Sequence, residues 1–202
     1  MSKLATAFIR IDAANAADPN VVLVGEAERP AALVYSERMS GALARLYPEA
    51  SEALRLAVRA QHIRRWTVPR TSYPMDRPGY LRWRNDLKQR HAEWTGAILA
   101  DCGYSEAEIA RVGALIRKDN MKRDPEAQAL EDCACVVFLE SYVDDFARKH
   151  DEAKLAGILE KTWTKMSDHG RQAALGLALS PRIGGLVARI AKGRPHAQGP
   201  AS

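Results

Sequence analysis

The sequence predicts an all-α protein that forms a multi-helix bundle, and three observations indicate this fold class. Alternating patterns typical of β-strands are scarce, whereas apolar residues recur at helical spacing along most of the chain. Residues that begin and end helices are abundant. One segment, "ACVVFLESYV", is apolar nearly all round, which is typical of a buried central helix.

Helix-breaking residues divide the first part of the chain. Asp18-Pro19 ends a first helix, and we expect residues 20–29 to form a loop or one short extended piece at "VVLV". Pro30 and Pro48 suit the first turns of two further helices. The segment "TVPRTSYPMDRP" holds three prolines and must be a loop, over residues 67–78. The predicted helices of this part cover residues 3–16, 30–46 and 48–65.

Helix caps divide the second part of the chain in the same way. Gly103 suits the residue after a last helical turn, because glycine accepts a left-handed conformation. Ser105 and Glu108 form a capping box, and Asp124-Pro125 and Asp151 each begin a helix. The predicted helices of this part cover residues 79–102, 105–118, 125–149 and 151–167, and two short helices follow them.

Length and composition predict one domain. The chain has 202 residues, and we expect a single helical domain at 1–192 followed by a disordered basic tail at 193–202. No run of 18 apolar residues exists and the N-terminus is a poor signal peptide, so no membrane association is expected. The three cysteines are an odd count, which favours reduced thiols and a cytoplasmic location.

The net charge of +5 is concentrated near the C-terminus. From Ser180 onward the chain has basic residues and no acidic ones, and the rest of the chain is nearly neutral. The pI of about 9.2 is therefore weak evidence for binding to nucleic acid.

Three long segments resemble an uncharacterised family, domain-of-unknown-function family 4202. They are "IDAANAADPN", "AQHIRRWTVPRTSYPMDRPGYLRWRNDLKQRHAE" and "QALEDCACVVFLE". This resemblance covers most of the chain and implies almost nothing about chemistry.

A second, more distant resemblance is to the HD superfamily of metal-dependent phosphohydrolases, whose pattern runs His…His-Asp…Asp on packed helices. The segment "YSERMSGALARLYPEASEALRLAVRAQHIRRW" is similar to the first two helices, and "ALEDCACVVFLE" is similar to the helix that carries the last aspartate. Tyr35 stands where the first histidine would be, and Ile63 stands where the paired aspartate would be. Only His62 and Asp132 keep residues of that pattern that bind the metal in the HD superfamily.

The HD resemblance implies a hydrolase that acts on a nucleotide or phosphate ester with a divalent metal (Mn, Mg, Fe or Zn). In that reading His62 and Asp132 hold the metal, and His91 is a third ligand or a general acid. We therefore expect His62, His91 and Asp132 to be the catalytic residues. The alternative is a hydrogen bond between His62 and Asp132 inside the bundle, which would satisfy a buried acid without metal.

A basic cluster suggests a phosphate-binding surface beside these residues. Arg84, Lys88 and His91 share one helix face through their i, i+4, i+7 spacing, and Arg65 and Arg70 lie at the start of the proline-rich loop. Planar guanidinium groups suit phosphate. The loop itself is either a lid or a rigid proline clip. A non-catalytic protein that binds a small phosphate ligand or an RNA through a degenerate HD site is the alternative function.

Overall fold

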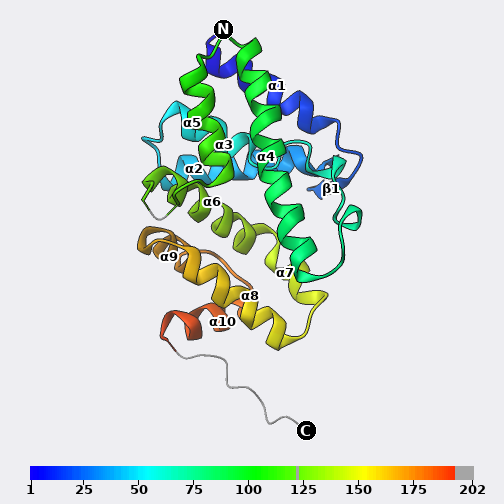
Figure 1. The fold of residues 1–202 in the computed structure, drawn as a ribbon. Helices are drawn as coiled ribbons and strands as arrows, with labels where there is room; N and C mark the ends of the chain where they lie inside the picture. The colour runs from blue at the N-terminus through cyan, green and yellow to red at the C-terminus, as the bar shows by residue number, and fades with distance from the viewer. Residues whose placement is uncertain (122, 194–202) are drawn as a thin grey trace. The chain divides into compact units, whose positions relative to one another are not determined.

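The computed structural model describes residues 1–121 and 123–193, and nearly all of its regular structure is helical (Figure 1). The predicted all-α class and multi-helix bundle are confirmed. The chain divides into two compact units, Met1–Leu130 and Glu131–Ser202, which we describe separately. The single domain expected at 1–192 stays a prediction, and the expected tail lies outside the described residues beyond Gly193.

The first unit is an assembly of helices with one small hairpin. α5 packs along α4 and also contacts α3, while α1 contacts α2, α3 and α4 (Figure 1). Large apolar side chains such as Ile11, Met39, Leu87 and Leu115 are fully buried between these helices, and each stabilises the unit by about 1.5–3 kcal/mol. Its elements are α1 (Lys3–Ala16), β1 (Val21–Val24), β2 (Ala27–Pro30), α2 (Ala31–Leu46), α3 (Glu52–Ala60), η1 (Arg65–Thr67), η2 (Arg70–Ser72), α4 (Arg77–Asp101), α5 (Glu106–Arg117) and the start of α6 (Pro125–Ser141).

Short polar side chains begin these helices, including α3, which starts at Glu52 after its Ser51 cap rather than at the predicted Pro48. The Ser51 hydroxyl accepts a hydrogen bond from the Leu54 N–H, and the Asp76 carboxylate accepts one from the Gly79 N–H. Ser105 and Glu108 form the predicted capping box. These contacts satisfy N–H groups that a helix leaves unpaired at its start.

The structure corrects the predicted end of the third helix. We expected it to reach residue 65, but α3 ends at Ala60 and the chain turns sharply through His62 to Arg64. Arg64 has a left-handed backbone with φ of 51°, a conformation that ends a right-handed helix. The buried Asn15 side chain of α1 accepts a hydrogen bond from the Arg64 N–H at 3.3 Å. This contact between distant segments helps to hold the turn.

Residues 20–29, expected to be a loop or one extended piece, contain a β-hairpin. β1 pairs antiparallel with β2, with Val21 opposite Pro30 and Val24 opposite Ala27. Gly25 has a φ of 62° at the two-residue turn, which is the chemistry that short hairpin turns require.

The second unit contains the rest of α6, α7 (Val143–Arg148), α8 (Glu152–Lys165), α9 (Asp168–Leu175) and α10 (Pro181–Ala191). The helix predicted over 125–149 is interrupted at Tyr142, whose φ of −132° separates α6 from α7. α6 is buried nearly all round, as expected from its composition. Among the described residues, no helix has both the length and the apolar character needed to span a bilayer.

Candidate functional site

A small cavity of about 50 Å³ in the first unit brings together five of the residues singled out in the sequence. It lies among the turn after α3, the middle of α4 and the C-terminal end of α5. Its volume is several times the roughly 10–15 Å³ that one water molecule occupies on this measure. We call it the basic cavity, and it is lined by Gln61, His62, Arg65, Arg84, Leu87, Lys88, His91, Ile116 and Lys118.

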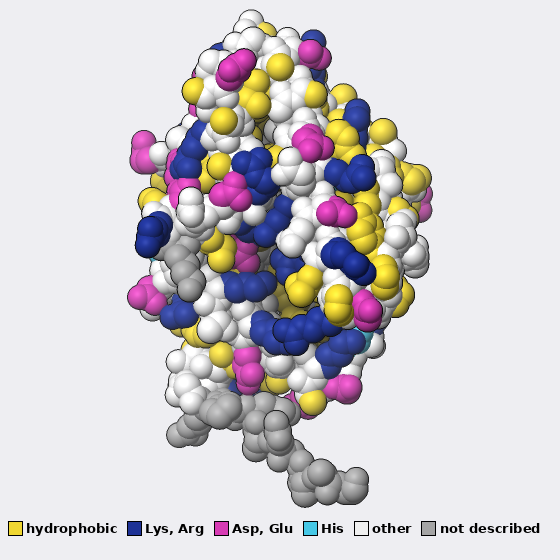
Figure 2. Space-filling model, in the orientation of Figure 1, with side chains coloured by type: hydrophobic (Ala, Val, Ile, Leu, Met, Phe, Trp, Pro, Cys, Tyr) yellow, Lys and Arg dark blue, Asp and Glu magenta, His cyan; other side chains and the backbone are white. Residues whose placement is uncertain are grey.

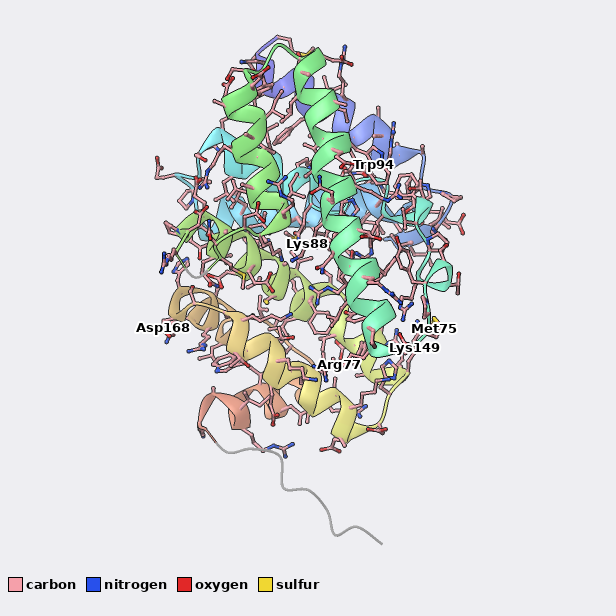
Figure 3. All side chains as sticks on the ribbon, viewed as in Figure 1. Met75, Arg77, Lys88, Trp94, Lys149 and Asp168 are labelled. Atoms are coloured by element: carbon pink, nitrogen blue, oxygen red, sulfur yellow. The ribbon has the colours of Figure 1, made fainter. Side chains whose placement is uncertain are left out.

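Three segments supply these side chains. The turn after α3 contributes Gln61, His62 and Arg65, and the left-handed residue Arg64 sets the direction in which Arg65 leaves the turn. On α4, Arg84, Lys88 and His91 share one face, as their spacing predicts. Lys88 extends on the side of α4 that faces α5 (Figure 3).

Lys118 joins the basic cavity from α5, and sequence reasoning missed it. It is the C-cap residue of α5 and has a left-handed backbone with φ of 62°. Such a conformation is uncommon for a residue with a side chain, and such residues are enriched at functional sites. Gln61 was missed as well, although it directly precedes His62.

His91 is the most deeply buried polar group of the basic cavity, with 2% of its surface exposed. Its Nδ1 lies 2.7 Å from the Ile63 carbonyl oxygen. A carbonyl only accepts hydrogen bonds, so Nδ1 carries the proton. Burial, with a smaller contribution from the Arg65 charge, lowers the pKa of His91 to about 4 against the raising effect of the Ile63 hydrogen bond. The imidazole is therefore neutral at pH 7, and its buried Nε2 has no hydrogen-bond partner among the described residues.

His62 is half-buried beside it. Its ring stacks on Tyr35 with centroids 4.5 Å apart, and its centroid lies 5.8 Å from that of His91. Burial holds the pKa of His62 well below 6.5, with further lowering from Arg65, His91, Lys118 and Arg84. Two neutral imidazoles therefore lie side by side at neutral pH.

Gln61 adds a second buried acceptor. Its side chain is 6% exposed, and its Oε1 has no hydrogen-bond partner among the described residues. A buried amide oxygen without a partner costs about 1–3 kcal/mol relative to a satisfied one. Two side chains that line the basic cavity, Gln61 and His91, therefore each contain a buried polar atom without a partner in the described part of the chain.

Four cations surround these groups. Burial lowers the pKa of Arg65, whose guanidinium lies 4.6 Å from the centre of the Trp83 ring. Arg84, Lys88 and Lys118 complete the set, and the described residues that line the cavity include no aspartate or glutamate. Several Lys and Arg side chains lie on the face of the molecule that Figure 2 shows. The electrostatic potential in the cavity therefore favours an anion.

Arg70, the other predicted ligand-binding arginine, is not among the residues that line the basic cavity. Its guanidinium donates to the carbonyls of Tyr73, Pro74 and Asp76 at 3.0, 2.7 and 3.1 Å. The indole N–H of Trp83 donates to the Val68 carbonyl at 2.9 Å. These bonds fasten the proline-rich loop to itself and to α4, and its role as a lid or a clip stays a prediction. A ligand-binding role for Arg70 stays a prediction.

Asp132 belongs to the second unit and is fully buried. Its carboxylate accepts hydrogen bonds from the Ser167 N–H at 2.8 Å and from the Ser167 hydroxyl. Ser167 is the N-cap of α9, and a Cβ added at Gly170 would lie only 2.6 Å from the Asp132 carboxyl carbon. The carboxylate thus fits closely against the start of a helix, where a negative charge is favoured.

The metal set His62, His91 and Asp132 stays a prediction because it joins residues of the two units. Among the described residues, no group of three or more His, Cys, Asp or Glu side chains is arranged to hold a metal ion. The first unit offers two imidazoles, one ligand fewer than the predicted set, so these residues alone do not fit a tightly bound metal.

Comparison with known proteins gives one match. A family model described as "Domain of unknown function (DUF4202)" matches residues 5–187. No curated protein and no solved structure matches the chain. The distant resemblance to HD phosphohydrolases is thus not supported by these comparisons and stays a prediction.

Proposed function

We propose that this chain, which belongs to the DUF4202 family, binds a small phosphate-bearing anion in the basic cavity. The observation that carries the proposal is the convergence of four cationic side chains on one cavity whose lining, among the described residues, includes no aspartate or glutamate. This is the non-catalytic alternative that the sequence left open.

The electrostatics of the basic cavity favour this ligand. The lowered pKa values of His62 and Arg65 reflect burial together with the charges of neighbouring Lys and Arg side chains. A positive potential of this kind attracts an anion. Arginine forks suit phosphate oxygens, and charge-assisted hydrogen bonds are about twice as strong as neutral ones.

The size of the cavity favours a small anion over a nucleic acid. Proteins that bind single-stranded RNA use an extended basic groove with aromatic side chains on which bases stack. The basic cavity is about 50 Å³, and its only rings from the described residues are the two imidazoles. RNA is therefore the weaker partner hypothesis.

Titration calorimetry of the whole chain with inorganic phosphate and with adenosine monophosphate tests the proposal. We expect saturable binding of at least one of them, and a loss of about 10-fold or more in affinity for Arg84→Gln, because a charge-assisted hydrogen bond contributes about 1.5–3 kcal/mol. Arg82→Gln is the matched control, since Arg82 lies on the same helix and is exposed. Absence of binding, or an equal loss in both variants, would contradict the proposal.

A phosphohydrolase that uses a divalent metal is the second candidate. The neutral imidazoles of His62 and His91 favour it, because neutral imidazole is the form that binds metals and accepts protons. Its test is phosphate release from a panel of nucleotides with added Mn²⁺, Mg²⁺, Zn²⁺ or Fe²⁺. Turnover that His62→Ala abolishes would favour the hydrolase, and saturable binding without turnover would favour the binding protein. Both proposals include a cytoplasmic location, which we expect from the odd count of three cysteines.

A further inference from the structure

A second and larger cavity lies in the first unit, among α1, the C-terminal half of α2 and the segment that leads into α3. Its volume is about 420 Å³, which is within the roughly 300–1,000 Å³ of pockets that hold small organic ligands. It shares no lining residue with the basic cavity. We call it the apolar cavity, and it is lined by Phe8, Ser40, Leu43, Ala44, Tyr47, Pro48, Ala50 and Arg55.

The walls of the apolar cavity are mainly apolar, and neighbouring polar contacts hold them in place. Phe8 lies beside Arg59, whose guanidinium carbon is 5.4 Å from the ring centre. That guanidinium donates to the Asp12 carboxylate at 2.7 and 2.6 Å and to the Ser40 hydroxyl at 3.3 Å. Ser40 in turn donates to the Ser36 carbonyl at 3.0 Å. The structure therefore already contains an apolar surface that could bury the body of a ligand.

Arg55 gives the apolar cavity a positive charge. Among the described residues that line it, Arg55 is the only charged one, and it is exposed. Its guanidinium donates to the Pro48 carbonyl at 3.2 Å, and four of its five N–H donors remain for other bonds. Glu49 and Glu52, the acids nearest to it in the sequence, do not line the cavity, and Glu52 accepts a hydrogen bond from the Tyr104 hydroxyl at 2.5 Å. The charge of the lining is therefore complementary to a ligand with one anionic group.

We propose that the apolar cavity binds a small monocarboxylic acid, whose apolar body lies against Phe8 and Leu43 while its carboxylate pairs with Arg55. Burial of the apolar body supplies most of the affinity, because removal of apolar surface from water is favourable. A planar guanidinium matches a carboxylate through two parallel hydrogen bonds, so the charge decides between ligands of the same shape. This site is independent of the proposed function, since the basic cavity uses none of its residues.

Calorimetric titration of the whole chain with ligands of similar shape and different charge tests the proposal. The probes are 3-phenylpropionate, its neutral amide and the cation 3-phenylpropylamine. We expect the acid to bind about 5-fold more tightly than the amide, which is the size of effect that an exposed ion pair gives, and the amine to bind most weakly. Octanoate and its amide, titrated in parallel, distinguish an aliphatic from an aromatic body.

A preference for the acid within either pair supports the proposal. Absence of binding of both acids, or binding no tighter than that of the amides, would overturn it. Both results would leave the proposed function standing, because that function is tested with phosphate and adenosine monophosphate.

Two variants locate the acid in the apolar cavity, and both change exposed residues that line it. Arg55→Gln should reduce the preference for acid over amide to about one, whereas the control Arg82→Gln should keep it. Ala44→Phe fills the space and should weaken acid and amide alike by about 10-fold or more, because the ligand can no longer be buried there. Its control is Ala13→Phe, at an exposed position of α1 outside the lining. Unchanged binding in both cavity variants would overturn the proposal.

Arg84→Gln separates the two cavities, because Arg84 lines the basic cavity alone. This variant should bind 3-phenylpropionate and octanoate as tightly as the unaltered chain does. A loss of acid affinity in Arg84→Gln, with none in Arg55→Gln, would assign the acid to the basic cavity and overturn the proposal.

Discussion

His91 in the first unit and Asp132 in the second are both buried polar groups, and their surroundings differ in one decisive respect. The Asp132 carboxylate accepts from the N–H and the hydroxyl of Ser167 at the start of α9. His91 has one nitrogen satisfied by a backbone carbonyl and the other unpartnered beside a cavity. Both side chains are buried, so burial alone does not distinguish them. The state of their hydrogen bonds separates a carboxylate that is satisfied within the fold from an imidazole that is only half satisfied by the described residues.

The largest effect expected from this comparison is at Asp132. Asp132→Ala removes the acceptor from Ser167 and leaves buried donors unsatisfied, so we expect the free energy of unfolding to fall by about 3 kcal/mol. Urea denaturation measures it. Asp168→Ala is the matched control at the start of the same helix, because the Asp168 side chain is 98% exposed, and its effect should stay within about 0.5 kcal/mol.

Gly170 probes the same carboxylate without removing it. The Cβ of Gly170→Ala would lie 2.6 Å from the Asp132 carboxyl carbon, so we expect a loss of about 1–3 kcal/mol from overpacking. Gly157→Ala in α8 meets nothing within 4 Å and should be neutral or stabilising by up to about 1 kcal/mol. Equal changes in the free energy of unfolding for the two substitutions would contradict the prediction, because the close packing around Asp132 would then make no contribution to stability.

The pH dependence of stability sharpens the His91 side of the comparison. The pKa of His91 is about 4 in the folded chain against an ordinary value of 6.5, so between these pH values the unfolded chain binds the proton and the folded chain does not. Stability is therefore full above pH 6.5 and falls as the pH drops toward 4, by up to about 1.4 kcal/mol per pH unit for this histidine. His62, whose pKa is also lowered, acts in the same direction.

Denaturation curves measured from pH 7.5 to pH 4.5 for the unaltered chain and for His91→Gln test this dependence. The variant should show a shallower decline over the same range, since it lacks the group responsible. Identical slopes for the two proteins would assign the acid sensitivity to other groups.

The smallest effect, and the one with the opposite sign, is expected at Gln61. Gln61→Met removes a buried acceptor that has no partner, so we expect the ligand-free chain to gain about 1 kcal/mol of stability. The melting temperature without added anion reports it. Gln89→Met is the control: Gln89 is exposed and bonds Glu93 at 2.9 Å, so its replacement should lower stability slightly or not at all. A loss of stability at Gln61 would mean that its amide is already satisfied.

Local signals in the sequence predicted much of the fold. Serine, aspartate and proline at helix starts act within one turn, so the capping box at Ser105 and the cap at Asp151 could be identified without the structure. The end of α3 could not, because the turn that follows it is held by a hydrogen bond from the Arg64 N–H to the Asn15 side chain, 49 residues away. The hairpin was missed because strand pairing is likewise a property of two segments.

The candidate site was predictable to a similar degree. Helical spacing placed Arg84, Lys88 and His91 on one face, and the turn after α3 brings His62 and Arg65 to the same cavity. Lys118 gave no signal, because its place depends on the left-handed end of α5. Arg70 has the same chemistry as Arg65, but its guanidinium binds backbone carbonyls of its own loop. The sequence does not show which of two arginines will bind the backbone and which will line the cavity.

A hydrogen bond from the Arg64 N–H to Asn15 connects α1 to the turn that carries Arg65, although no residue of α1 lines the basic cavity. Asn15 is almost entirely enclosed, and its amide oxygen orients the Ile63–Arg64 peptide, one residue before Arg65. A chain shortened at its N-terminus, or the variant Asn15→Val, would therefore lose the alignment of Arg65 while every residue that lines the cavity stayed the same.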